Sequence, residues 1–167
     1  VELTVSFEGQ VKRVVTATTV DRIVRVPIEM IMKGDLDPFR VWAPGSPNLY
    51  DLRVRLLKDG DALDQVDTYF GMRKIERRDG RIYLNNSPLY QKLILDQGYW
   101  PDSNITPPSD EAIRLDLQYI LDFGYNGARK HQKLEDPRFY YWADKMGVLV
   151  WGEVPSPYDF TDETVLN

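Results

Sequence analysis

The stretch from Tyr119 to Val154 decides the fold and reads YILDFGYNGARKHQKLEDPRFYYWADKMGVLVWGEV. It contains a helical pattern, a glycine, a short strand and a polar loop, followed by a second helix, glycine and strand. Gly124 and Gly147 stand at matching positions, directly after the two helical patterns. Helices that alternate with strands in this way predict a parallel sheet. Residues that follow such strands are the first candidates for chemistry.

Working outward, residues 90–154 predict a βαβαβ segment. The expected strands are apolar, and the last is continuously so, as is typical of a sheet covered on both faces. Each expected helix begins at a capping residue, Ser109 or Asp136, and ends at a glycine. The strands are expected at Tyr90–Leu95, Tyr125–Ala128 and Val148–Trp151.

Before residue 85 the sequence predicts an antiparallel β-sandwich, because its short strands alternate apolar and polar residues and no helical period occurs. A polar loop is expected at Lys33–Phe39. Asp79-Gly80 predicts a type I′ hairpin, and Asn85-Asn86-Ser87-Pro88 predicts a second turn. The strands are expected at Val1–Phe7, Lys12–Thr19, Arg22–Met30, Leu49–Leu57 and Gln65–Phe70.

Composition excludes several classes of function. The formal net charge of −5 argues against a nucleic-acid partner, whose phosphates call for a basic surface. No apolar run approaches the roughly 20 residues that span a membrane. With no cysteine and one histidine, thiolate and multi-histidine metal sites are excluded, and no cofactor is expected.

The two ends of the sequence lack features of a complete protein. The chain begins with Val1, carries no signal peptide, and stops at Asn167 after about two and a half βα units, whereas a closed eight-fold barrel needs roughly 250 residues. The sequence therefore predicts a piece of a longer protein. A bacterial origin is expected, with the compartment left open between cytoplasm and secretion.

An ordered set of short motifs resembles glycoside hydrolase family 2, which includes β-galactosidases, β-glucuronidases and β-mannosidases. Each motif is weak alone, but together they keep the order of the family. The motifs are Trp42-x-Pro44, Pro47-x-Leu49-Tyr50, Phe70-Gly71-Met72-Arg73, Leu84-Asn85-x-x-Pro88, Tyr125-Asn126-x-x-Arg129 and Asp144-x-x-Gly147-x-x-Val150-x-x-Glu153.

The resemblance implies an immunoglobulin-like β-sandwich over residues 1–84 and the opening of a truncated TIM barrel over residues 85–167. It also implies that the parent protein is a retaining, exo-acting glycoside hydrolase of terminal β-linked sugars. Such enzymes use two carboxyl groups about 5 Å apart. The first belongs to an Asn-Glu pair in this family, and this sequence contains no such pair. Both catalytic glutamates are therefore expected beyond Asn167, and this chain alone is expected to be inactive.

Five residues are predicted to contact a carbohydrate substrate, and none is predicted to be catalytic. Arg129 and His131 follow the expected second strand. A solvated basic loop would explain Arg129 equally, and it is the favoured interpretation for His131. Glu153 ends the third strand, where it could pair with Arg129, contact sugar or form a structural ion pair. Asp96 and Trp100 stand in the loop after the first strand.

Other interpretations stay open. Trp151 is favoured as a core residue over a sugar-stacking one. The family often reads Arg-x-Ser-His where this chain has Arg129-Lys130-His131-Gln132, so substrate specificity cannot be transferred. The chain could instead be a stand-alone carbohydrate-binding or interaction module. Self-association through residues 90–154 is expected, since exposed strand edges invite pairing.

Overall fold

The structure is a computed structural model that describes residues 1–31 and 39–156. Its first compact unit comprises Val1–Glu76 with Leu84–Asn86, and its second comprises Arg77–Tyr83 with the chain from Ser87 onward. Within the described ranges, no helix is long and apolar enough to cross a membrane.

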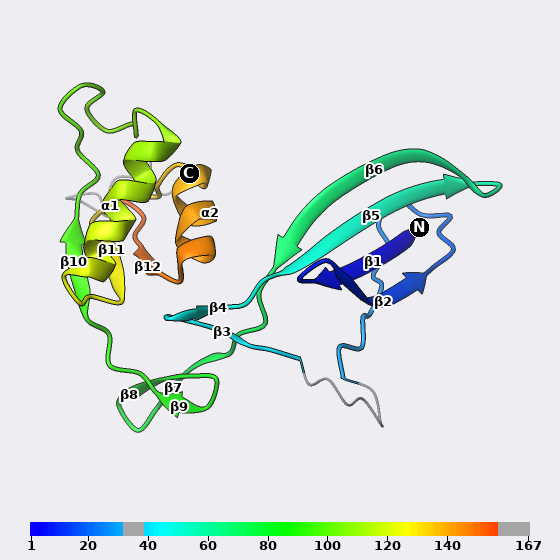
Figure 1. The fold of residues 1–167 in the computed structure, drawn as a ribbon, viewed down its shortest axis with the longest axis horizontal. Coiled ribbons are helices and arrows are strands. Elements are labelled where there is room, and N and C mark those ends of the chain that lie inside the picture. Colours follow the sequence, from blue (N-terminus) through cyan, green and yellow to red (C-terminus); the bar gives the residue numbers. More distant parts are fainter. Residues whose placement is uncertain (32–38, 157–167) are drawn as a thin grey trace, which may run out of the picture. The chain divides into compact units, whose positions relative to one another are not determined.

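The first unit is built on a four-stranded antiparallel sheet in the order β2-β1-β5-β6, and its strands lie side by side in Figure 1. A short ribbon, β3-β4, accompanies the sheet. The bounds are Glu2–Phe7 (β1), Gln10–Thr16 (β2), Trp42–Ala43 (β3), Ser46–Pro47 (β4), Tyr50–Lys58 (β5) and Asp61–Phe70 (β6).

One face of this sheet forms the core of the first unit. In β1 the alternate residues Leu3, Val5 and Phe7 are buried, as the sequence pattern predicts. The Tyr50 ring packs against Phe7 and stacks on Phe70 with ring centroids 5.4 Å apart. A sheet with one buried apolar face is consistent with the predicted β-sandwich.

The predicted strand at Arg22–Met30 is wrong, because residues 17–31 contain no strand. The guanidinium of Arg13 donates hydrogen bonds to the carbonyl oxygens of Glu29 and Met30, at 2.9 and 3.0 Å. A side chain thus takes carbonyl groups that a neighbouring strand would otherwise use. The predicted loop at Lys33–Phe39 lies, apart from Phe39, outside the described residues.

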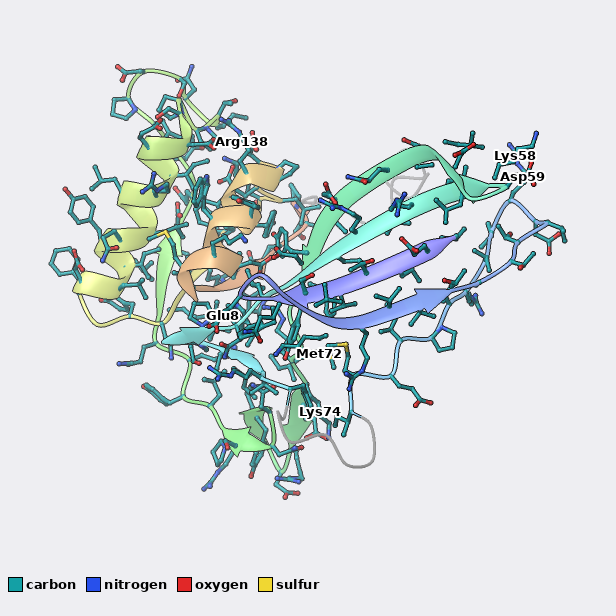
Figure 2. All side chains as sticks on the ribbon, turned by 45° about the vertical axis from the view of Figure 1, so that its right-hand side comes forward. Glu8, Lys58, Asp59, Met72, Lys74 and Arg138 are labelled. Atoms are coloured by element: carbon teal, nitrogen blue, oxygen red, sulfur yellow. The ribbon has the colours of Figure 1, made fainter. Side chains whose placement is uncertain are left out.

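The predicted tight turns are confirmed by their backbone angles. Asp79 and Gly80 have φ of 50° and 73°, as a type I′ hairpin requires, between β7 (Ile75–Arg78) and β8 (Arg81–Leu84). Asn85-Asn86 likewise turns the chain into β9, Ser87–Pro88, with both residues at positive φ. The β5–β6 hairpin turns at Asp59-Gly60, and Figure 2 shows Asp59 at its tip.

The second unit contains a three-stranded parallel sheet with two helices, as the alternating pattern predicts. The strand order is β10-β11-β12, and a helix follows each of the first two strands. The bounds are Leu93–Asp96 (β10), Asp110–Asp122 (α1), Gly127–Lys130 (β11), Pro137–Met146 (α2) and Leu149–Gly152 (β12).

The helix boundaries follow the predicted capping residues. The hydroxyl of Ser109 accepts a hydrogen bond from the N–H of Ala112, and the carboxylate of Asp136 accepts one from the N–H of Arg138. Gly147 ends α2 in the left-handed conformation, with φ of 76°.

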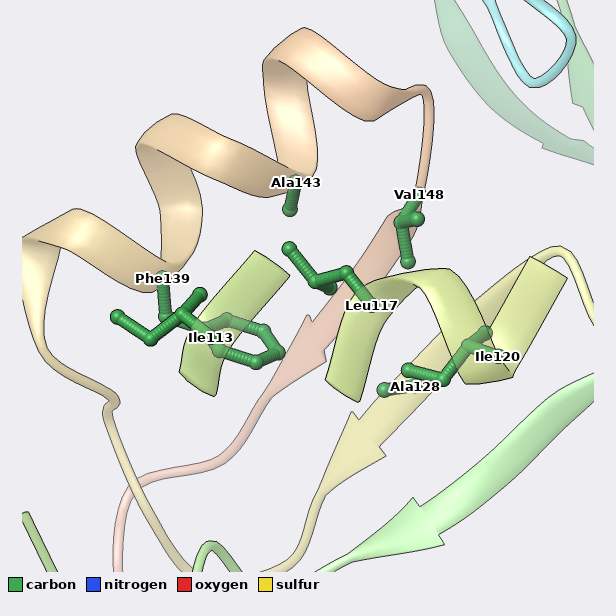
Figure 3. Close-up of a cluster of buried hydrophobic side chains, with 7 residues drawn as sticks. All are labelled: Ile113, Leu117, Ile120, Ala128, Phe139, Ala143 and Val148. Carbon is green, nitrogen blue, oxygen red and sulfur yellow. The ribbon is translucent and has the colours of Figure 1, made fainter. Parts of the chain in front are cut away.

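The helices pack on one face of the sheet through a single apolar cluster (Figure 3). Three residues come from α1, two from α2, one from β11, and one directly precedes β12. They are Ile113, Leu117, Ile120, Ala128, Phe139, Ala143 and Val148. The cluster fixes which face of the sheet is covered by helices.

All three strands of this sheet are displaced from their predicted positions, and β12 is displaced by one residue. β11 begins at Gly127, because Tyr125 still donates its N–H to the carbonyl of Ile120 in the turn after α1. β10 begins only at Leu93, because the Asn126 side chain hydrogen-bonds to the backbone N–H of Lys92 and the carbonyl oxygen of Tyr90. The shift of β11 places Arg129 inside the strand instead of after it.

Candidate functional site

The register of the parallel sheet sorts the predicted site residues onto two faces. Leu95, Arg129 and Trp151 stand side by side in neighbouring strands. Alternate residues point to opposite faces, so this row faces away from Ala128, which is buried under the helices. We call the side that carries Leu95, Arg129 and Trp151 the open face.

Arg129 and Glu153 form an ion pair at the carboxyl end of the sheet. The Nε–H of Arg129 donates to Oε1 of Glu153, and the backbone N–H of Gln132 donates to Oε2 at 3.0 Å. The Gln132 hydrogen bond and then the Arg129 guanidinium lower the pKa of Glu153, with a smaller contribution from His131. Glu153 is therefore an ionised carboxylate whose two oxygens are bound by Arg129 and by the backbone of Gln132. The predicted pairing is observed, while its role toward sugar stays a prediction.

His131 follows β11 and lies beside the loop after β10. Its backbone N–H donates to the carbonyl of Asp96 at 2.9 Å, and its Nδ1 lies 3.2 Å from the Nε2 of Gln97. Glu153 is close enough for the histidine to affect its pKa. The structure therefore brings three predicted residues, Arg129, His131 and Glu153, to one place.

The side chain of Asp96 lies on the face of the sheet opposite the open face, and its carboxylate binds groups of the protein itself. Its Oδ2 lies 2.5 Å from the ammonium of Lys130, and its Oδ1 accepts the backbone N–H of Gly98 at 2.7 Å. Both carboxylate oxygens thus already have donors. Sugar binding by Asp96 stays a prediction, and its observed contacts serve the fold.

The cation that holds Asp96 was not singled out by sequence analysis. Lys130 is 0% exposed, and its Nζ lies 2.9 Å from Oε2 of Glu135 and 3.9 Å from the Phe139 ring centroid. The interpretation of this segment as a solvated basic loop is therefore wrong for Lys130. Had β11 been extended to residue 130, alternation with buried Ala128 would have predicted this side chain beneath the helices.

Glu135 joins two lysines within the protein. Its side chain is 0% exposed, and its Oε1 lies 2.9 Å from Nζ of Lys133 and accepts the N–H of Asp136 at 3.0 Å. Burial would raise the pKa of Glu135, but the Asp136 hydrogen bond and the two lysines outweigh it and lower that pKa. We call Asp96, Lys130, Lys133 and Glu135 the buried charge cluster; its formal charges cancel.

Asp116 of α1 lies near this cluster, and its pKa is shifted in the opposite direction to that of Glu135. Burial, and after it the charge of Asp96, raises the pKa of Asp116. The carboxyl group lines an open pocket of about 430 Å³ together with Asp96 and Gln97.

The two tryptophans near the strand ends differ in their surroundings. Trp100 lies in the loop after β10, where its backbone N–H donates to the carbonyl oxygen of Asn104 at 2.5 Å. Its contact with sugar stays a prediction. Trp151 is 52% exposed on the open face of this three-stranded sheet, and its assignment to a barrel core stays a prediction.

Among residues 1–31 and 39–156, no group of three or more His, Asp or Glu side chains is arranged to hold a metal ion. An exposed indole beside an ion pair and an imidazole suits a sugar ring, which presents apolar faces and hydroxyl edges.

Sequence comparison relates the chain to sugar-cleaving enzymes. The family model described as glycosyl hydrolases family 2 matches residues 1–73. A putative β-glucuronidase of Formosa agariphila is 32% identical over 120 residues, which cover 70% of this chain and 14% of that protein. A β-galactosidase of Thermoanaerobacter pseudethanolicus is 28% identical over 156 residues, covering 92% of this chain and 21% of that protein. The chain thus spans a minor part of these relatives.

Structural comparison shows the same fold in solved enzymes. β-Glucuronidase 3 of Bacteroides uniformis matches 92% of this chain and 19% of its own, with a TM-score of 0.73 and 24% identity. A β-glucuronidase of Ruminococcus gnavus matches 99% of this chain and 27% of its own, with a TM-score of 0.80 and 19% identity. From the family match and these relatives together, the chain belongs to glycosyl hydrolases family 2.

Proposed function

We propose that this chain belongs to a retaining, exo-acting glycoside hydrolase that removes terminal β-linked sugars. In this proposal residues 1–84 form an immunoglobulin-like sandwich, and residues 85–167 supply the first strands of a TIM barrel. The Arg129–Glu153 pair at the carboxyl end of three parallel strands is the observation that carries it, since barrel enzymes keep their active sites at this end.

Arg129 and Glu153 fit a role in substrate binding better than a role in bond cleavage. A retaining glycosidase needs a nucleophilic carboxylate and a second carboxyl group that first donates a proton. Glu153 is ionised and so has no proton to donate, and its ion pair with Arg129 makes the carboxylate a weaker nucleophile. In the proposal, the two catalytic carboxyl groups come from other residues of the longer protein.

The proposed binding surface combines charge with an apolar plane. The guanidinium of Arg129 and the imidazole of His131 can donate hydrogen bonds to sugar hydroxyls, and Glu153 can accept them. Trp151, in register with Arg129, offers an indole face to the apolar side of a sugar ring. The relatives' names include both β-glucuronidase and β-galactosidase, so the substrate is left at terminal β-glycosides.

The test compares this chain with the longer protein that contains it. We expect the longer protein to hydrolyse one of a panel of nitrophenyl β-glycosides, including the glucuronide and the galactoside, and the isolated chain to hydrolyse none. Proton NMR of the first product formed should show the β-anomer, since retention preserves configuration. An α-anomer would refute the retaining mechanism, and a longer protein inactive on the whole panel would refute the function.

A further inference from the structure

Residues 97–107 make up most of the connection between β10 and α1, and this loop is held by Lys133, which is distant in sequence. Nζ of Lys133 donates to the carbonyl oxygen of Gly98 at 3.2 Å and also to that of Ile105. The same ammonium forms a 2.9 Å ion pair with Glu135. One side chain therefore ties both ends of the loop to the start of α2.

The carboxylate that anchors Lys133 is buried. Glu135 is buried and is itself held by Lys130 and by the N–H of Asp136. Gly98 has φ of 68°, and a Cβ there would lie 2.6 Å from both Nζ of Lys133 and Oε2 of Glu135. The loop backbone thus approaches the buried charge cluster so closely that glycine is required.

The anchored loop carries residues that belong to the candidate site. Gln97 lies 3.2 Å from the ring nitrogen of His131, and Trp100 stands three residues further along. The carbonyl oxygen of Lys133 accepts the backbone N–H of Glu153 at 3.4 Å. Lys133 therefore contacts the loop through its side chain and the acidic end of the site through its backbone.

We propose that Lys133 is a positioning residue, which fixes the 97–107 loop so that Gln97 and Trp100 are already in place when sugar binds. This inference rests on the proposed function. In it, Lys133 touches no reacting atom, so its loss weakens substrate binding through the disorder of the loop. Ordering a loop on binding costs affinity, whereas a loop held in advance does not incur that cost.

Hydrogen exchange on this chain tests the anchoring without any sugar. In Lys133→Met, the amides of residues 98–106 should exchange at least about tenfold faster, because local opening loses its anchor. The amides of α2 should keep wild-type rates, and Lys133→Arg should restore most of the protection because it keeps charge and donors. Lys92→Met is the matched control, since Lys92 is an exposed lysine of the same unit. Equal loop rates in wild type and Lys133→Met would overturn the proposal.

Kinetics of the longer protein test the consequence for substrate. Lys133→Met should raise KM at least about tenfold while kcat changes less than about threefold, the pattern of lost binding. Lys133→Arg should recover most of the KM, and Lys92→Met should leave both constants unchanged. A fall in kcat at constant KM would overturn the positioning role. If the wild-type protein cleaves no glycoside, the proposed function fails, and the substrate role of Lys133 fails with it, while the exchange rates still decide whether Lys133 holds the loop.

Discussion

Arg129 and Lys130 are neighbours in the chain, yet their side chains lie on opposite faces of the parallel sheet. Arg129 is exposed and pairs with Glu153, whereas Lys130 is 0% exposed and pairs with Asp96 and Glu135. Strand alternation separates them, because successive residues of a strand point to opposite sides. The two cations therefore have different roles: substitution of Lys130 should lower stability, and substitution of Arg129 should lower activity.

Lys130→Met should destabilise the second unit by about 1–3 kcal/mol, because partly buried Asp96 loses its cation and buried Glu135 keeps only Lys133. Methionine keeps much of the side-chain length, so the loss reports mainly on charge. Urea denaturation followed by tryptophan fluorescence measures the free energy of unfolding. Lys92→Met, an exposed lysine, should stay within about 0.5 kcal/mol of wild type. A Lys130→Met variant as stable as wild type would show that the cluster does not stabilise the fold.

The stability of the chain should respond to Asp116 in a defined direction. Its pKa is raised from the ordinary 3.8, chiefly by burial. Between its unfolded and folded pKa values this acid binds more protons when folded, so its effect is to lower stability as pH rises through that window. Asp116→Asn should therefore have a higher melting temperature than wild type at neutral pH, and the difference should vanish below the ordinary pKa.

The control for this prediction is Asp102→Asn, which makes the same change in net charge at an exposed loop position. It should leave the difference between neutral and acidic pH as in wild type. Equal stabilisation by both substitutions would attribute the effect to net charge and contradict a specific role of burial.

Gly127→Ala should destabilise the parallel sheet by about 1–3 kcal/mol, the usual cost of overpacking. A Cβ at this position would lie 2.5 Å from the carbonyl oxygen of Leu149 and 2.7 Å from Cδ2 of Leu93. Gly152→Ala is the matched control in β12, where the nearest atom, the Tyr140 hydroxyl, is 3.2 Å away and can move. Thermal melts of both variants measure the difference. A larger loss in Gly152→Ala would contradict this account of the packing.

Sequence analysis predicted the order of elements in the second unit because the capping signals that bound its helices are local. Ser109, Asp136 and Gly147 act on backbone groups within a few residues, so these residues predict where both helices begin and where α2 ends. The wrong prediction at Arg22–Met30 came from a longer-range contact. The segment at Arg22–Met30 has strand-like composition, but Arg13 engages its carbonyl groups from another strand.

The candidate site was predicted in part for the same reason. The positions of Arg129 and Glu153 near strand ends can be inferred from the chain, and their pairing follows from proximity. The burial of Lys130 can be predicted only if the strand extends to residue 130. The predicted strand ended two residues earlier, at Ala128, so the burial was missed. The contact of Lys133 with Gly98 joins residues 35 apart in sequence, and no local pattern encodes such a contact.

Self-association of this chain is expected through the second unit. β10 and β12 form the edges of its described sheet, and Leu95 and Trp151 are 57% and 52% exposed on the open face. Exposed edges and apolar faces invite pairing with another copy. Light scattering across a concentration series should show oligomers that Leu95→Lys weakens. Val66→Lys, which changes an exposed valine of the first unit, should not weaken them. A wild-type monomer at every concentration would contradict the expectation.

The Arg129–Glu153 pair should affect activity far more than stability. Exposed ion pairs stabilise proteins little, so Arg129→Met and Glu153→Gln should leave the urea midpoint of this chain nearly unchanged. In the longer protein, each should lower kcat/KM for the active glycoside by about ten- to a hundredfold, since small displacements of binding groups are costly. The double variant should lose no more than the worse single variant, because residues that act as one unit are not additive. Loss of stability without loss of activity would identify the pair as a structural ion pair and remove it from the site.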